Sequence, residues 1–236
     1  MKLAPSLDAW QMFGHLTRLL EWRSPIVKKA FSVVAFTAVA LLLETQASHA
    51  WALSLCATPK QASDIQQAYA RQPGVVPLEI ARKLGLTEET VVTGLSDTQS
   101  LGTIDGQSFA KVWQSLTTWE QPAVVIPLEN DDVVEVTGRI SSRIFSKDGE
   151  VQIETVGSGI GGHFHPSNIA AIHSLSLPRK DGQTLHGVIF FSADGKTIIS
   201  VYAVASTKPA LIALLSSDAY QKTRELIASL PRHCPK

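Results

Sequence analysis

The sequence predicts an α+β fold: an antiparallel β-sheet flanked by an N-terminal helical hairpin and a C-terminal helix. Apolar residues recur with a helical period before Trp119 and with an extended period after it. Asp-Gly dipeptides, which favour tight hairpin turns, stand at 148–149, 181–182 and 194–195. A last helical stretch lies between Pro209 and Pro231, and it should cover the sheet.

The first predicted elements are helices. Residues 63–71 form one, and residues 78–84 and 88–95 form a helix, turn and helix around Gly85, with Thr87 as a natural N-cap. The pair is similar to a DNA-reading helix-turn-helix. Acidic side chains balance the basic ones across it, however, which is wrong for a groove reader. We therefore interpret it as a structural hairpin.

The strands follow Trp119. Six are predicted, at residues 123–128, 133–140, 151–156, 169–175, 184–191 and 198–205. Because Asp-Gly turns connect several of them, the sheet should be antiparallel.

The composition is that of an ordinary folded domain. Hydrophobic residues make up 44% of the 236 residues, which is enough to form a core. Lysine plus arginine equals aspartate plus glutamate at 21 each, so no basic excess neutralises a phosphate backbone. Nucleic acid is therefore not an expected partner.

Residues 1–55 are predicted to be an N-terminal extension with a signal-like or membrane-targeting hydrophobic segment, and residues 60–232 one domain. Lys28 and Lys29 precede an uncharged run at 30–43. This run is short for a bilayer-spanning helix and fits a secretory signal better. Ser48 and Ala50 would flank the cleavage site. A buried helix and a misassigned start codon are the alternatives.

Two cysteines lie near the ends of this domain. Cys56 and Cys234 could form one disulfide if the termini meet in an oxidising compartment. They could equally be two idle thiols.

Two imidazoles stand between a glycine pair and an apolar run at 161–172. In an extended segment His163 and His165 share one face and Phe164 lies on the other. Neutral histidine is a common axial ligand of haem iron, so an imidazole could be presented to a porphyrin lying on an apolar sheet. For an isolated His-x-His pair, two solvated histidines in a surface hairpin are the more common alternative.

The order of these features resembles the ChuX/HutX family of intracellular haem-utilisation carrier proteins. The features are the helical pair at 78–91, the segment 109–119 before a strand, the Gly-His motif, and the β-rich runs 187–195 and 198–202. The resemblance covers roughly residues 65–205. Its strength is the order of the motifs, because no single one is diagnostic.

The resemblance implies a haem-binding carrier that pairs into a homodimer and passes haem to a haem-accepting or haem-degrading protein. His163 falls on the family's Gly-His ligand position and Asn168 on the asparagine after it. Phe190 and Tyr202 fall on the paired strands. The implied cofactor is non-covalent haem. The implied location is the cytoplasm, with the periplasm as the alternative if the signal-like segment works, and membrane contact is expected only through that segment.

The sequence departs from the family pattern twice. Where many members carry a further histidine, residues 125–129 read Val-Ile-Pro-Leu-Glu, and His165 is the candidate substitute ligand. Where the family has Gly-Arg-Asp, residues 203–206 read Ala-Val-Ala-Ser, which removes a cationic partner for a propionate. Arg139 is a candidate replacement by charge-assisted hydrogen bonding, with a solvated rim as the alternative. A member that has lost haem binding is therefore also possible.

The candidate cofactor-binding residues are His163, His165, Phe190, Tyr202 and Arg139, and the candidate metal ligands are His163 and His165. Tyr202 could reach a propionate or iron, or be a wall residue. No hydrolase, phosphate-loop or zinc-protease motif is present, so no enzyme is predicted. The alternatives are a haem-degrading protein, a zinc or copper module in which His173 or His186 joins the pair, and a non-binding interaction domain.

Overall fold

The computed structural model describes residues 55–128, 132–155, 157, 159–203 and 210–234. The predicted N-terminal extension lies outside these residues, apart from Leu55. Among the described residues, no helix is long and apolar enough to cross a membrane.

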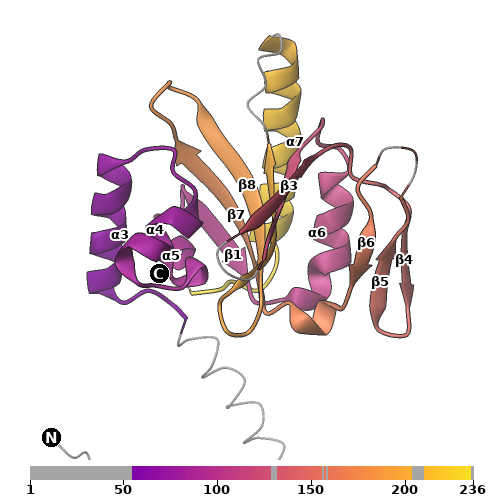
Figure 1. Ribbon diagram of the computed structural model, residues 1–236, viewed down its shortest axis with the longest axis horizontal. Helices are drawn as coiled ribbons and strands as arrows, with labels where there is room; N and C mark the ends of the chain where they lie inside the picture. The colour runs from indigo at the N-terminus through magenta and orange to yellow at the C-terminus, as the bar shows by residue number, and fades with distance from the viewer. Residues whose placement is uncertain (1–54, 129–131, 156, 158, 204–209, 235–236) are drawn as a thin grey trace, which may run out of the picture. The chain divides into compact units, whose positions relative to one another are not determined.

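Three helices form a layer on one face of the main sheet: α3 (Pro59–Arg71), α4 (Pro77–Leu84) and α5 (Glu88–Thr93) (Figure 1). Thr58 caps α3 with a reciprocal capping box, and α4 ends at Gly85, whose φ of 64° suits glycine. Thr87 caps α5 by accepting a hydrogen bond from the Thr90 N–H, as predicted. The layer is a packed structural element, because Ile65, Ile80 and Val91 are buried against the sheet.

The main sheet has six antiparallel strands in the order β1-β7-β8-β9-β2-β3. Their bounds are β1 (Ser100–Thr103), β2 (Ala123–Pro127), β3 (Val133–Thr137), β7 (Ala171–Pro178), β8 (Thr184–Phe191) and β9 (Thr197–Ala203). The predicted Asp-Gly turns join β7 to β8 and β8 to β9, and Gly182 and Gly195 adopt positive φ there. The predicted α+β class and antiparallel sheet are confirmed.

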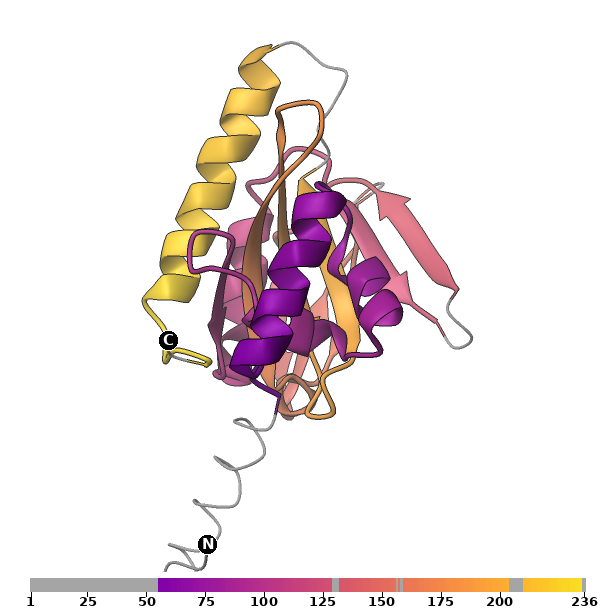
Figure 2. The ribbon, with the colours of Figure 1, turned by 90° about the vertical axis from the view of Figure 1, so that its left-hand side faces the viewer.

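The opposite face of the sheet carries α6 (Phe109–Leu116) and α7 (Ala210–Ala228) (Figure 2). Side chains alternate along β8: Val188 and Phe190 join the core under α6 and α7, while Ile189 and Phe191 join the core under the helical hairpin. The sheet therefore has a hydrophobic core on both faces.

A second, three-stranded sheet consists of β4 (Ile144–Lys147), β5 (Glu150–Ile153) and β6 (Gly162–Phe164). Neither β4 nor β6 was predicted, nor was β1, because these strands have only three or four residues and little apolar alternation. Phe164 anchors the small sheet to the core, with its ring centroid 4.9 Å from Phe109 and 5.2 Å from Trp113.

The two cysteines are joined. Cys56 and Cys234 form a disulfide that links the segment before α3 to the segment after α7. The termini of the described domain therefore meet, which the sequence left open.

Candidate functional site

His163 lies at the centre of β6, opposite Gln152 of β5. Its side chain is 68% exposed, and its Nδ1 lies 3.2 Å from Oε1 of Glu150. Hydrogen bonds from Gln152 and then from His163 hold the pKa of the Glu150 carboxyl below its ordinary value. A carboxylate that engages one ring nitrogen fixes the ring and directs the other nitrogen, Nε2, to a ligand.

His163 and His165 border the same cavity, which has a volume of about 300 Å³. His165 directly precedes the short 3₁₀ helix η3 (Pro166–Asn168), which brings Asn168 to the cavity as well. Apolar side chains form the rest of the wall: Ile126, Phe164, Ile169, Ile198 and Ile199. The arrangement suits a flat apolar ligand that an imidazole can coordinate.

Phe190, expected to contact the cofactor, is fully buried. Its ring packs 5.3 Å from Phe109 and 6.0 Å from Trp113, between the sheet and α6. It does not border the His163 cavity. The expectation of direct contact is therefore corrected: β8 presents Phe190 to the core, because that face of the sheet is covered by helices.

Tyr202 lies in a different cavity, of about 410 Å³, between α4 and the face of β2, β3 and β9. Arg82, Arg179, Glu79, Glu88 and Glu135 also border it. Burial raises the pKa of the Tyr202 hydroxyl well above its usual range, and the nearby Glu88 adds to the shift. Tyr202 thus borders a different cavity from His163, although the sequence analysis had placed both residues in one candidate site.

Arg139 is exposed and borders neither cavity. Its backbone carbonyl accepts a hydrogen bond from Ile160, which ties the segment after β3 to the segment before β6. The structure therefore does not bring its guanidinium to the imidazole pair, because the strand ends before it.

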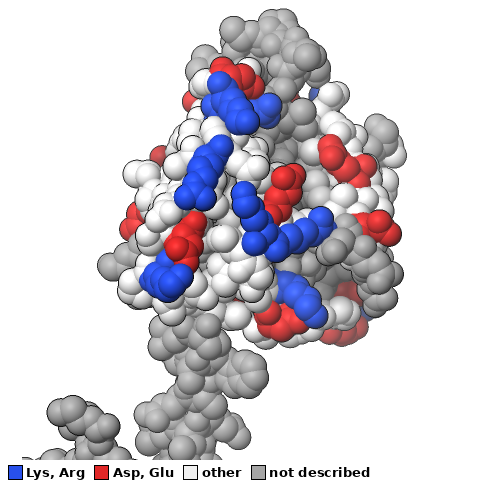
Figure 3. Space-filling model, turned by 60° about the vertical axis from the view of Figure 1, so that its left-hand side comes forward, with Lys and Arg blue, Asp and Glu red and all other residues white. Residues whose placement is uncertain are grey.

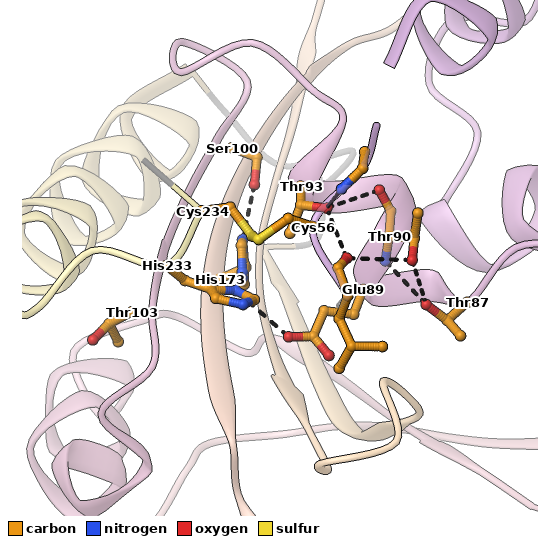
Figure 4. Close-up of polar contacts among 12 residues, drawn as sticks. Cys56, Thr87, Glu89, Thr90, Thr93, Ser100, Thr103, His173, His233 and Cys234 are labelled. Carbon is orange, nitrogen blue, oxygen red and sulfur yellow. Dashed lines mark hydrogen bonds and ion pairs between the residues drawn. A yellow bond between two sulfur atoms is a disulfide. The ribbon is translucent and has the colours of Figure 1, made fainter. Parts of the chain in front are cut away.

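The histidines His173 and His186 do not join His163 and His165. Within the described residues, the groups of three potential metal ligands contain neither His163 nor His165. His173 instead belongs to a buried chain in which Ser100, His173, His233 and Glu89 follow one another at hydrogen-bonding or ion-pair distance (Figure 4). The sequence analysis did not identify Glu89 and His233, because they are distant in sequence from His173. The possible disulfide at Cys234 was the one signal that His233 could lie near the start of the domain.

Charges of both signs are interspersed on the side of the molecule where the helical hairpin lies (Figure 3). The visible face carries no broad field of positive charge of the kind that binds a phosphate backbone.

The chain is thus a small α+β domain in which two imidazoles border an apolar cavity. A family model described as "Haem utilisation ChuX/HutX" matches residues 103–213. No curated protein matches the sequence significantly. This match bears out the resemblance to the ChuX/HutX family that the sequence predicted.

Several solved structures share the fold. A protein from Erwinia carotovora matches with a TM-score of 0.59 and 19% identity, over 69% of this chain and 98% of that chain. The heme-binding protein ChuX matches with a TM-score of 0.56 and 20% identity, over 69% and 98%. ChuS, a heme degrading enzyme of Escherichia coli O157:H7, matches with a TM-score of 0.52 and 18% identity, over 72% of this chain and 47% of that chain. At these identities the likeness shows the fold alone.

Proposed function

We propose that the protein binds haem reversibly and non-covalently through His163 and passes it to a haem-accepting or haem-degrading partner. The observation that carries the proposal is the position of the His163 ring at an apolar cavity, with Nδ1 engaged by Glu150 and Nε2 left for iron. Haem would supply the iron, and this chain the imidazole and the apolar surface.

The cavity favours a carrier over a permanent haem protein. Its volume is at the lower end of the range for ligand cavities, so it would receive one face of a macrocycle rather than enclose it. Because His163 and His165 are both exposed, haem could arrive and leave without any change in the core. His165 is the candidate second ligand, since it borders the same cavity.

The larger cavity beside Tyr202 is the competing location. Its arginines could pair with propionates, but three carboxyl groups border it against two guanidiniums, which disfavours an anionic ligand. The raised pKa of Tyr202 also disfavours the phenolate that iron would require. We therefore place haem at His163.

The test is a hemin titration of the purified protein, followed by visible absorption. A shifted Soret band is expected in the native protein and a loss of at least tenfold in affinity in His163→Ala. His165→Ala tests the second ligand, and Tyr202→Phe, which keeps the ring, serves as the control for the other cavity. An unchanged spectrum in His163→Ala together with a lost one in Tyr202→Phe would move the site to the larger cavity.

Haem degradation is the second candidate function, favoured by the likeness to the fold of ChuS. Incubation of the haem complex with a reductant and oxygen separates the two functions. A carrier keeps its porphyrin absorbance, whereas a degrading enzyme converts it to a linear tetrapyrrole.

Location and assembly stay predictions. The resemblance favours the cytoplasm, whereas the Cys56–Cys234 disulfide favours an oxidising compartment such as the periplasm. N-terminal sequencing of the native protein would show whether processing occurs after Ala50. Sedimentation of the same sample would measure whether a homodimer forms.

A further inference from the structure

Three buried ligand atoms converge where β7, α5 and the C-terminal segment meet (Figure 4). Nε2 of His173 lies 2.9 Å from Nδ1 of His233. The His233 Nδ1 atom in turn lies 3.5 Å from Oε1 of Glu89. All three atoms lie within 4.8 Å of one another. The residues that carry them are 2%, 5% and 1% exposed.

The two printed distances, 2.9 Å and 3.5 Å, lie on either side of the ligand–ligand spacing in a zinc site. With bonds of about 2.0–2.2 Å, tetrahedral geometry places neighbouring ligand atoms about 3.3 Å apart. Two imidazoles and one carboxylate are also a ligand set that zinc uses in proteins. We propose that Glu89, His173 and His233 form a binding site for a divalent transition metal of the zinc class, separate from His163.

The surroundings orient the ligands as a metal site requires. Oγ of Ser100 lies 3.1 Å from Nδ1 of His173, so the serine engages one ring nitrogen and Nε2 faces the cluster. Gly102 on the adjacent strand gives the ring its space, because a Cβ there would lie 2.2 Å from the imidazole. The disulfide at Cys234 fixes the residue next to His233.

The donor set calls for a cation. Two imidazole nitrogens that face each other share one hydrogen when both rings are neutral, so at least one nitrogen offers only a lone pair. Oε2 of Glu89 has no hydrogen-bond partner among the described residues. A divalent cation would accept lone pairs from both rings and the carboxylate, and would offset the charge of a buried carboxylate.

Metal binding should be coupled to the closure of the C-terminal segment. His233 lies beyond α7, and its backbone N–H donates to the carbonyl of Gly102, which holds the segment against β1. Because the three ligands are buried, a metal can enter only when this segment opens. Bound metal should therefore leave slowly.

The test uses the untagged full chain, stripped of metal with a chelator and titrated with Zn²⁺ by calorimetry and with Co²⁺ by visible absorption. One equivalent of metal per chain is expected at the cluster. Glu89→Gln and His173→Gln, checked for folding by circular dichroism, should each weaken Zn²⁺ binding at least tenfold. The control is the double variant His163→Ala/His165→Ala, which removes the surface pair and should retain this binding.

Three results would overturn the proposal: a folded native protein that takes up neither ion, full binding in both folded cluster variants, or loss of binding in the surface control. If the cluster variants do not fold, the melting temperature of the native chain and of the surface control decides. A rise of the same size with Zn²⁺ in both supports the buried site. No rise in either, or a rise confined to the native chain, contradicts it.

Discussion

Nδ1 of His163 and Oε1 of Glu150 lie 3.2 Å apart across the pairing of β5 with β6. The carboxylate is two residues from Gln152, the cross-strand partner of His163, and Gln152 donates its own hydrogen bond to the other carboxylate oxygen. The proposed ligand His163 is thus oriented by the Glu150 carboxylate, which is itself oriented by a hydrogen bond from Gln152. Metal-binding imidazoles in proteins are usually supported by such a carboxylate.

Removing this support should weaken haem binding without removing the ligand. Glu150→Gln is expected to lower hemin affinity by about 10- to 100-fold, because the ring loses its orientation and some basicity. Soret titration measures the change. Glu154→Gln is the matched control, since Glu154 directly follows β5 and pairs with Arg143 rather than with His163. Equal losses in both variants would show that Glu150 has no specific role.

Glu88 should make stability fall as pH rises. Burial raises the pKa of the Glu88 carboxyl from 4.5 to about 6, although the hydrogen bond donated by Thr197 partly lowers it. The folded state then binds the proton more tightly than the unfolded state, so this contribution is full below pH 4.5 and is lost as pH rises through 6. The loss amounts to about 2 kcal/mol of unfolding free energy at 1.36 kcal/mol per pKa unit.

Urea unfolding between pH 4 and pH 7.5 measures this effect. The difference between the native protein and Glu88→Gln isolates the contribution of Glu88, since other titrating groups are common to both. A difference that stays constant across this range would contradict the raised pKa.

The disulfide should contribute strongly to stability. It joins two cysteines with a sequence separation of 178. Breaking it therefore raises the conformational entropy of the unfolded chain and favours unfolding. We expect Cys56→Ser/Cys234→Ser to lower the unfolding free energy by about 2–5 kcal/mol. Urea unfolding with and without reductant measures this. The double variant should be insensitive to reductant, and a native protein that is equally insensitive would show that the bond is absent or contributes nothing.

Phe190 should behave as a core residue. Phe190→Ala is expected to lower the unfolding free energy by about 3–5 kcal/mol, because it leaves a cavity between Phe109 and Trp113. Phe190→Leu should lose less and should keep hemin affinity within about twofold of the native value. A stable Phe190→Leu variant that binds hemin poorly would show that Phe190 contributes to hemin binding after all. Thermal unfolding and Soret titration of the two variants give both quantities.

Local signals in the sequence were sufficient for the frame of the fold. The Thr87 cap, Gly85 and the Asp-Gly turns act over a few residues, and the helical hairpin and the β7-β8-β9 hairpins are where those signals placed them. The ring packing of Phe164 against Phe109 and Trp113 was not predicted, because these residues are distant from it in sequence. Helix capping and hairpin turns are short-range, so a single sequence reveals them.

Which residues share a site was decided by long-range packing. The face of β8 that carries Phe190 is covered by α6, and Tyr202 faces the opposite side of the sheet from the His163 cavity. His173 meets His233 across 60 residues of sequence, and His233 meets Glu89 where the C-terminal segment, which the disulfide joins to Cys56, returns beside the hairpin layer. The sequence by itself predicted the fold class and the resemblance to the ChuX/HutX family, and it singled out the two neighbouring histidines. The tertiary structure alone decided which cavity each candidate borders, because those neighbours depend on strand order and on chain ends that no local pattern specifies.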